Sequence, residues 1–252
     1  MKKTVSLFFV FSLMLTSFTA GAQNLRGDVN LDGRVSIDDV VELIDYLLLG
    51  QWPEDVHEWV DLGLPSGTLW ATCNVGATTP EDFGDYFAWG EVSPKEVYNW
   101  STFKWCNGSV NTMTKYCSYS EYGYNGFADY KTELDDEDDA AYVNWGSDWR
   151  IPSKEQFYEL RDNCTWQWTQ LNGVDGQLVT GPNGNTMFLP AAGCLLNDTS
   201  GFVWRGMYWA HSCDSYNVAG SIYLEFDSGN IGIMSGNRSF GQSVRAVRVS
   251  QN

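Results

Sequence analysis

Residues 135–164 read DDEDDAAYVNWGSDWRIPSKEQFYELRDNC and are the only strongly helical region of residues 59–252. Acids at 135–139 precede Ala140, Ala141 and Val143, and negative charge is favoured at the start of a helix because the helix dipole is positive there. We therefore expect a first helix that opens in this acidic run. A solvated helix start is one interpretation of the run, and a calcium site is the alternative.

A second helix is expected shortly afterwards. Residues 149–152 have an extended pattern, and Ser153 with Gln156 has the spacing of a capping box, in which each side chain bonds the other residue's backbone N–H. The inward face of this helix is expected to comprise Phe157, Leu160 and Cys164.

Strand patterns flank the helical region on both sides. Residues 59–76 read as two strands joined by a Pro-Ser-Gly turn. Residues 177–190 predict a hairpin about Gly-Pro-Asn-Gly, and 221–234 alternate about an Asp-Ser-Gly-Asn turn. Residues 243–250 predict a core strand, whereas 82–126 are rich in Gly, Tyr, Trp, Ser and Asn and predict long ordered loops. Helices between groups of strands indicate an α+β fold.

Several segments resemble the Fibrobacter succinogenes major paralogous domain, which is abundant in exported proteins of gut Bacteroidetes. They are VDLGLPSGTLWATCNVGATTPEDFGDYFAWGE (60–91), DDAAYVNWGSDWRIPSKEQFYEL (138–160), FLPAAG (188–193) and SVRAVR (243–248). The middle is also similar to formylglycine-generating-enzyme-like domains, at residues 139–142, Trp145 and residues 150–157. For residues 59–252 the resemblance implies a C-type-lectin-like domain, with two helices, a small twisted antiparallel sheet whose ends pair, and long loops.

The first 22 residues predict a secretory signal peptide. Lys2 and Lys3 precede an apolar run that ends at Ala20-Gly21-Ala22, an A-x-A cleavage site. The run is short for a membrane span and is interrupted by Ser and Thr. We expect an exported protein that is secreted, periplasmic or on the cell surface, with no transmembrane segment after signal cleavage.

Composition excludes several classes of protein. The formal charge of −17 disfavours binding to nucleic acid and to anionic membranes. Aromatic residues make up 15% of the chain, which is too many for a disordered protein. The length allows one sizeable core and a small appendage.

Residues 28–39 have the spacing of a calcium loop. Oxygen ligands at alternating positions surround the ion, and Gly33 makes the sharp turn. The expected ligands are Asp28, Asn30, Asp32, the Arg34 carbonyl, Ser36 and Asp39. A helix should follow, with Ser36 as its cap. Its apolar stripe is expected to comprise Ile37, Val40, Val41, Ile44, Leu47 and Leu48.

This stretch resembles one type I dockerin repeat, placed here at residues 23–51 and followed by a linker at 52–58. Dockerins bind cohesin domains and tether secreted proteins, often polysaccharide-degrading enzymes, to a scaffold. The chain departs from that family because it has a single repeat, and a lone helix of this length is marginal in water. Its apolar stripe is therefore expected to pack on the main domain, on a partner or on another copy.

Six cysteines leave two interpretations open. An even number in an exported chain permits disulfides, and Cys106 with Cys117, which bracket a polar loop, is the pair we favour. Alternatively, several are buried free thiols that pack as small hydrophobic groups. No C-x-x-C motif is present.

No catalytic residues can be assigned from the sequence. His211 and Cys213 could form a thiolate–imidazole pair, but residues two apart on a strand share a face without any catalytic meaning. The chain has 32 acids, and none stands out as a glycosidase pair. A sugar could instead stack on exposed aromatic faces, or the same aromatics could pack in the core. The candidate ligand-binding residues are Trp204, Tyr208, Trp209 and Arg238.

Two functions remain open. One is a non-enzymatic binding or adhesion module that recognises a glycan or a surface protein, with the calcium module as a tether. The other is an enzyme, or an enzyme subunit, of a polysaccharide-degrading assembly, docked to a cohesin-like partner through residues 23–51. In a third, structural interpretation, the calcium module only stabilises the large domain.

Overall fold

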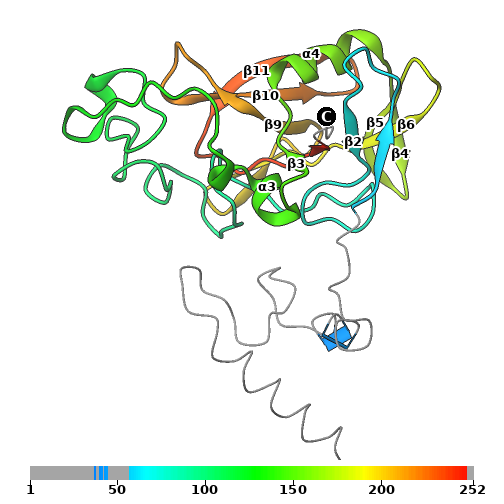
Figure 1. Cartoon of the computed structure of the whole chain (residues 1–252), viewed down its shortest axis with the longest axis horizontal. Coiled ribbons are helices and arrows are strands. Elements are labelled where there is room, and N and C mark those ends of the chain that lie inside the picture. Colours follow the sequence, from blue (N-terminus) through cyan, green and yellow to red (C-terminus); the bar gives the residue numbers. More distant parts are fainter. Residues whose placement is uncertain (1–36, 38–39, 42, 45–56, 249–252) are drawn as a thin grey trace, which may run out of the picture. The chain divides into compact units, whose positions relative to one another are not determined.

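A computed structural model describes residues 37, 40, 41, 43, 44 and 57–248 of the chain (Figure 1). Contacts divide the chain into two units, residues 1–56 and 57–252, and each unit is described by itself. In the first unit the described positions are helical, as expected after the calcium loop. Four of them expose 48–71% of their surface: Ile37, Val40, Val41 and Ile44.

The second unit consists of small antiparallel sheets and, between residues 57 and 248, two α-helices. The helices are α3 (Ala140–Trp145) and α4 (Lys154–Asn163), and the short 3-10 helices are η1 (Ser120–Tyr122), η2 (Tyr124–Gly126) and η3 (Asp136–Asp138). The strands are β1 (Trp59–Asp61), β2 (Leu69–Ala71), β3 (Trp149–Arg150), β4 (Thr165–Leu171), β5 (Val174–Thr180), β6 (Thr186–Pro190), β7 (Cys194–Leu196), β8 (Thr199–Gly201), β9 (Gly206–Cys213), β10 (Gly220–Phe226), β11 (Ile231–Asn237) and β12 (Val247–Arg248).

One sheet joins the two ends of this unit, in the order β1-β2-β12-β3. The β1–β2 connection contains the expected Pro-Ser-Gly turn, in which the Gly67 N–H donates to the Leu64 carbonyl at 2.9 Å. Val247 of β12 lies between Trp70 of β2 and Arg150 of β3. The C-terminal segment is therefore central to the core, as expected, and within the described residues its strand comprises Val247 and Arg248.

A second sheet, in the order β11-β10-β9, packs against α4 (Figure 1). Helix α4 begins where the sequence predicted. The Ser153 hydroxyl accepts from the Gln156 backbone N–H, and the Gln156 side-chain Oε1 accepts from the Ser153 backbone N–H, so the capping box is confirmed. Phe157 and Leu160 are fully buried in a cluster with residues of β9 and β10, whereas Cys164 is half-buried. Burying these two side chains stabilises the helix by about 1.5–3 kcal/mol each.

The remaining strands form the hairpin sheet β4-β5-β6 and the pair β7-β8. The predicted turn between β5 and β6 is confirmed, since the Gly184 N–H donates to the Gly181 carbonyl at 3.0 Å. Residues 82–126 are long loops with only two 3-10 turns, as their composition indicated. The α+β interpretation holds at this level, with small antiparallel sheets and few helices in the described part.

Candidate functional site

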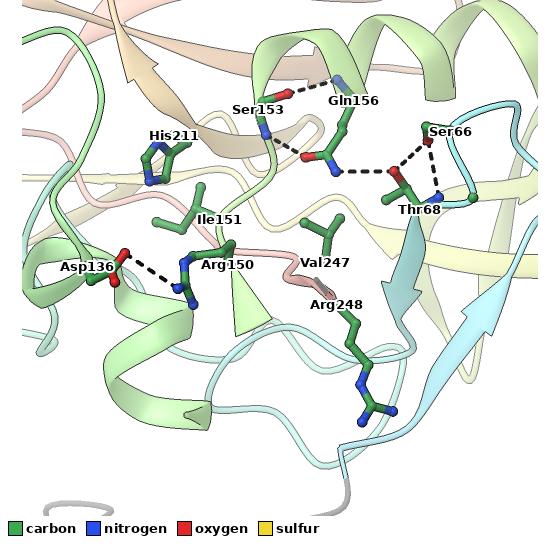
Figure 2. A pocket seen from close by; sticks show the side chains of 11 residues that line it. Ser66, Thr68, Asp136, Arg150, Ile151, Ser153, Gln156, His211, Val247 and Arg248 are labelled. Carbon is green, nitrogen blue, oxygen red and sulfur yellow. Dashed lines mark hydrogen bonds and ion pairs between the residues drawn. The ribbon is translucent and has the colours of Figure 1, made fainter. Parts of the chain in front are cut away.

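A polar pocket of about 480 Å³ opens where the β1–β2 turn, the start of α4 and strand β12 meet (Figure 2). Ile151 and Val247 contribute apolar surface to its walls. The remaining lining is mostly polar and comes from Ser66, Gly67, Thr68, Asp136, Arg150, Ser153, Gln156, His211 and Arg248. This volume is within the range of small-ligand pockets, whereas the lining is more polar than is usual for them.

One wall is a chain of hydrogen bonds that runs from α4 to the β1–β2 turn (Figure 2). The Gln156 amide nitrogen donates to Thr68 Oγ1 at 3.1 Å, and the Thr68 and Ser66 hydroxyls are 2.6 Å apart. Ser66 Oγ then donates to Glu159 at 2.5 Å. The capping box orients Gln156 at the head of this chain, so helix formation itself positions the polar wall.

Arg150 forms the opposite wall. Its guanidinium donates to the carbonyls of Ser147 and Trp149 at 3.0 and 2.7 Å and lies over the Tyr142 ring. It also lies 3.5 Å from the Asp136 carboxylate (Figure 2). These contacts hold Arg150 in one orientation at the pocket wall.

Arg248 is the less constrained of the two arginines. Its side chain is 37% exposed, forms an ion pair with Asp148 at 3.2 Å and lies 6.0 Å from the centre of the Trp59 ring. An exposed ion pair of this kind contributes little to stability. Arg248 can therefore exchange Asp148 for a ligand group at small cost.

His211 lies between two carboxylates. Its Nδ1 is 3.1 Å from Glu133, and its Nε2 is 3.7 Å from the buried Asp139. Burial raises the pKa of Glu133, but the hydrogen bonds from His211 and Ser212 outweigh it, so the net shift is downward. The two carboxylates, one at each ring nitrogen, thus fix the orientation of the His211 imidazole.

Asp139 holds this region together. Its fully buried carboxylate accepts from the N–H groups of Ala141, Tyr142 and Ile151 at 2.8, 3.1 and 2.9 Å. Burial raises the pKa of this carboxyl group. Asp139 therefore caps α3 and also fixes Ile151, whose side chain lines the pocket.

The rest of the acidic run is occupied by cationic side chains and by a tyrosine. Asp138 is buried, lies 2.6 Å from Lys115 Nζ and accepts from the Tyr116 hydroxyl at 2.7 Å. Asp135 lies 2.6 Å from both Lys115 and Lys131. These contacts agree with a helix start. The acidic run forms the short 3-10 helix η3, and the α-helix α3 begins after it at Ala140. Between residues 57 and 248, no three His, Cys, Asp or Glu side chains converge as a metal site would need.

The six expected calcium ligands, at positions 28, 30, 32, 34, 36 and 39, lie outside the described residues. The four expected sugar-binding residues are described, but they do not form one surface. Trp204 is 57% exposed, whereas Tyr208, Trp209 and Arg238 are buried, so these three are not accessible to a sugar and only Trp204 offers an exposed face.

The polar ends of these buried groups bond inside the protein. The Tyr208 hydroxyl donates to the Pro190 carbonyl at 2.6 Å, and the Trp209 indole N–H donates to the Phe87 carbonyl at 2.7 Å. The Arg238 guanidinium donates to the carbonyls of Tyr116 and Gly220. Core packing, the alternative interpretation of these aromatics, is what the structure shows.

The favoured disulfide is absent. All six cysteines lie within residues 57–248, and none is bonded to another. Cys106 Sγ donates to the Trp100 carbonyl and Cys117 Sγ to the Tyr119 carbonyl, so the two thiols have different partners. Cys213 is buried, and burial raises the pKa of its thiol, which opposes thiolate chemistry beside His211.

No protein-family model, curated protein or solved structure matches the chain. Among the described residues, no helix has both the length and the apolar character to cross a membrane. The sequence patterns did not identify the pocket residues Ser66, Thr68 and Arg248. The available signal was the Ser153–Gln156 capping box, which located the helix end around which they gather.

Proposed function

We propose that the chain is an exported binding module that recognises a glycan through the polar pocket, and that the preferred ligand carries an acidic sugar. The pocket lining is the observation that carries this proposal. It combines hydroxyl, amide and guanidinium groups with a small apolar area at Ile151 and Val247, which are 4% and 2% exposed. Sugars present the same combination, with hydroxyls at the edge of the ring and C–H groups on its faces.

Charge favours an acidic sugar over a neutral one. Arg150 and Arg248 line the pocket together with one carboxylate, Asp136, in a chain whose formal charge is −17. Guanidinium groups bind carboxylates with paired, charge-assisted hydrogen bonds. Because Arg150 already bonds two backbone carbonyls, Arg248 is the group we assign to the ligand carboxylate.

The finer fold and the tether belong to the same proposal. Pairing of the terminal strands β1 and β12 with β2, together with two helices and long loops, supports a C-type-lectin-like arrangement. We also propose that residues 28–39 bind Ca²⁺, because their alternating oxygen donors suit that ion. The exposed stripe at Ile37, Val40, Val41 and Ile44 supports docking of this module on a cohesin-like or other surface protein.

A glycan array tests the binding proposal. The full chain is screened in calcium and again in chelator, against uronic-acid oligosaccharides and their carboxyl-reduced counterparts. We expect hits among the acidic glycans and weaker binding after reduction of the carboxyl groups. An array without acidic hits in both conditions would overturn the proposal.

One observation favours a second candidate, an enzyme of a polysaccharide-degrading assembly. His211 lines the pocket and is paired with Glu133, an arrangement that orients an imidazole for proton transfer. Incubating each array hit with the protein and measuring new reducing ends distinguishes the two candidates. Release of reducing ends that is lost in His211→Gln would favour the enzyme.

A further inference from the structure

A second recess, of about 360 Å³, lies in the long-loop region, apart from the residues that line the polar pocket. We define it as the tyrosine cleft. Its lining residues are Val110, Tyr119, Glu121, Tyr122, Tyr216, Asn217, Val218 and Ala219. Three tyrosines from two separate loops therefore share one concave surface.

These tyrosines are held outward by ordered backbone. Tyr216 is 91% exposed, although a ring of this size is usually at least half-buried. Its N–H donates to the Asp214 carboxylate at 2.9 Å, and the Gly220 N–H closes the same loop onto the Asn217 carbonyl at 2.8 Å. The loop thus presents the ring from a fixed backbone.

The facing loop is fixed as well. Tyr122 lies on η1, and its carbonyl accepts from the Met113 N–H at 2.8 Å. The Tyr119 hydroxyl donates to the Ser215 carbonyl at 3.3 Å, which bridges the two loops. Beneath them, Met113, Cys117 and Val218 pack in one buried cluster. The cleft is therefore preorganised, which reduces the entropic cost of binding.

We propose that the tyrosine cleft binds a neutral pyranose of an oligosaccharide. Aromatic rings offer flat faces for the C–H faces of the sugar, while the Glu121 carboxylate and the Asn217 amide can bond its hydroxyls. Glu121 is the only charged lining residue, so an anionic ligand is disfavoured. The site is independent of the polar pocket, which carries two arginines.

The test is calorimetric titration of the full chain with neutral hexasaccharides: cellohexaose, xylohexaose and mannohexaose. We expect at least one to bind, and Tyr216→Ala to weaken that binding by about three- to tenfold, the value of one aromatic face. Tyr122→Ala removes a second ring of the cleft and should also weaken binding of that hexasaccharide. Tyr216→Phe keeps the ring and should bind within about twofold of the wild type if stacking provides the affinity.

Two control variants make the result specific. Tyr130 is 73% exposed and does not line the cleft, so Tyr130→Ala should bind as the wild type does. Arg248→Gln should not change neutral-sugar binding, whereas it should weaken acidic-sugar binding at the polar pocket. Failure of all three hexasaccharides to bind, or unchanged binding in both Tyr216→Ala and Tyr122→Ala, would overturn the proposal without affecting the one for the polar pocket.

Discussion

Replacing Asp139 with alanine should be the most damaging single change near the polar pocket. The substitution removes the acceptor of three backbone N–H groups, those of Ala141, Tyr142 and Ile151. Loss of the cap on α3 costs about 0.5–2 kcal/mol. An N–H group left without a partner at Ile151, which is 4% exposed, costs about a further 1–3 kcal/mol. We therefore expect the free energy of unfolding to fall by about 1.5–5 kcal/mol.

Urea unfolding followed by tryptophan fluorescence measures this loss. Glu137→Ala is the matched control, because Glu137 belongs to the same acidic run but its side chain is 78% exposed. Surface substitutions of this kind usually change stability by less than about 0.5 kcal/mol. Equal stabilities of Asp139→Ala and Glu137→Ala would refute the assignment of Asp139 as the residue that caps α3 and fixes Ile151.

Three further changes have defined outcomes. The hydrogen bonds from Lys115 and Lys131 hold the pKa of Asp135 below its usual value, so its stabilising effect is present above the unfolded pKa near 3.9 and is lost as pH falls through the folded pKa. In urea unfolding, Asp135→Asn should thus lower the free energy of unfolding by about 0.2–1 kcal/mol at pH 6 and by progressively less below pH ~4. A difference in stability between wild type and variant that widens in acid would contradict this. A Cβ at Gly181 would overlap the Leu62 carbonyl, so Gly181→Ala should lower the free energy of unfolding by about 1–3 kcal/mol. The loss should appear as a lower midpoint of thermal unfolding. Calcium should raise the helical circular dichroism signal of the wild-type chain but not that of Asp28→Ala. An equal response in both proteins would contradict the assignment of residues 28–39 as a calcium loop.

Local signals predicted most of the secondary structure. The Ser153–Gln156 capping box and the Gly181–Gly184 turn depend on residues close in sequence, so their patterns are readable without the fold. The buried aromatics had a weaker signal. Seven of the eight residues of β9 are buried, and a short, mainly apolar run of this kind indicates a strand covered on both faces rather than an exposed platform.

Long-range contacts explain what the sequence did not predict. Arg238 resembles a surface arginine in a loop, yet its two carbonyl acceptors come from Tyr116 and Gly220, which the fold brings together. Ser66, which lines the polar pocket, bonds to Glu159, and the two are 93 residues apart in sequence. Such pairings depend on the packing of whole elements, and no local pattern encodes them.

The most direct test of the central claim measures the charge dependence of acidic-glycan binding. Trigalacturonic acid is titrated into the wild-type chain, Arg248→Gln and Arg161→Gln. Arg161 is the matched control, since it lies on α4, is paired with Asp162 and does not line the polar pocket. A hydrogen bond to a charged group contributes about 1.5–3 kcal/mol, so Arg248→Gln should raise Kd by about tenfold or more, with Arg161→Gln unchanged. Equal affinities of all three proteins, or no binding by the wild type, would contradict the account.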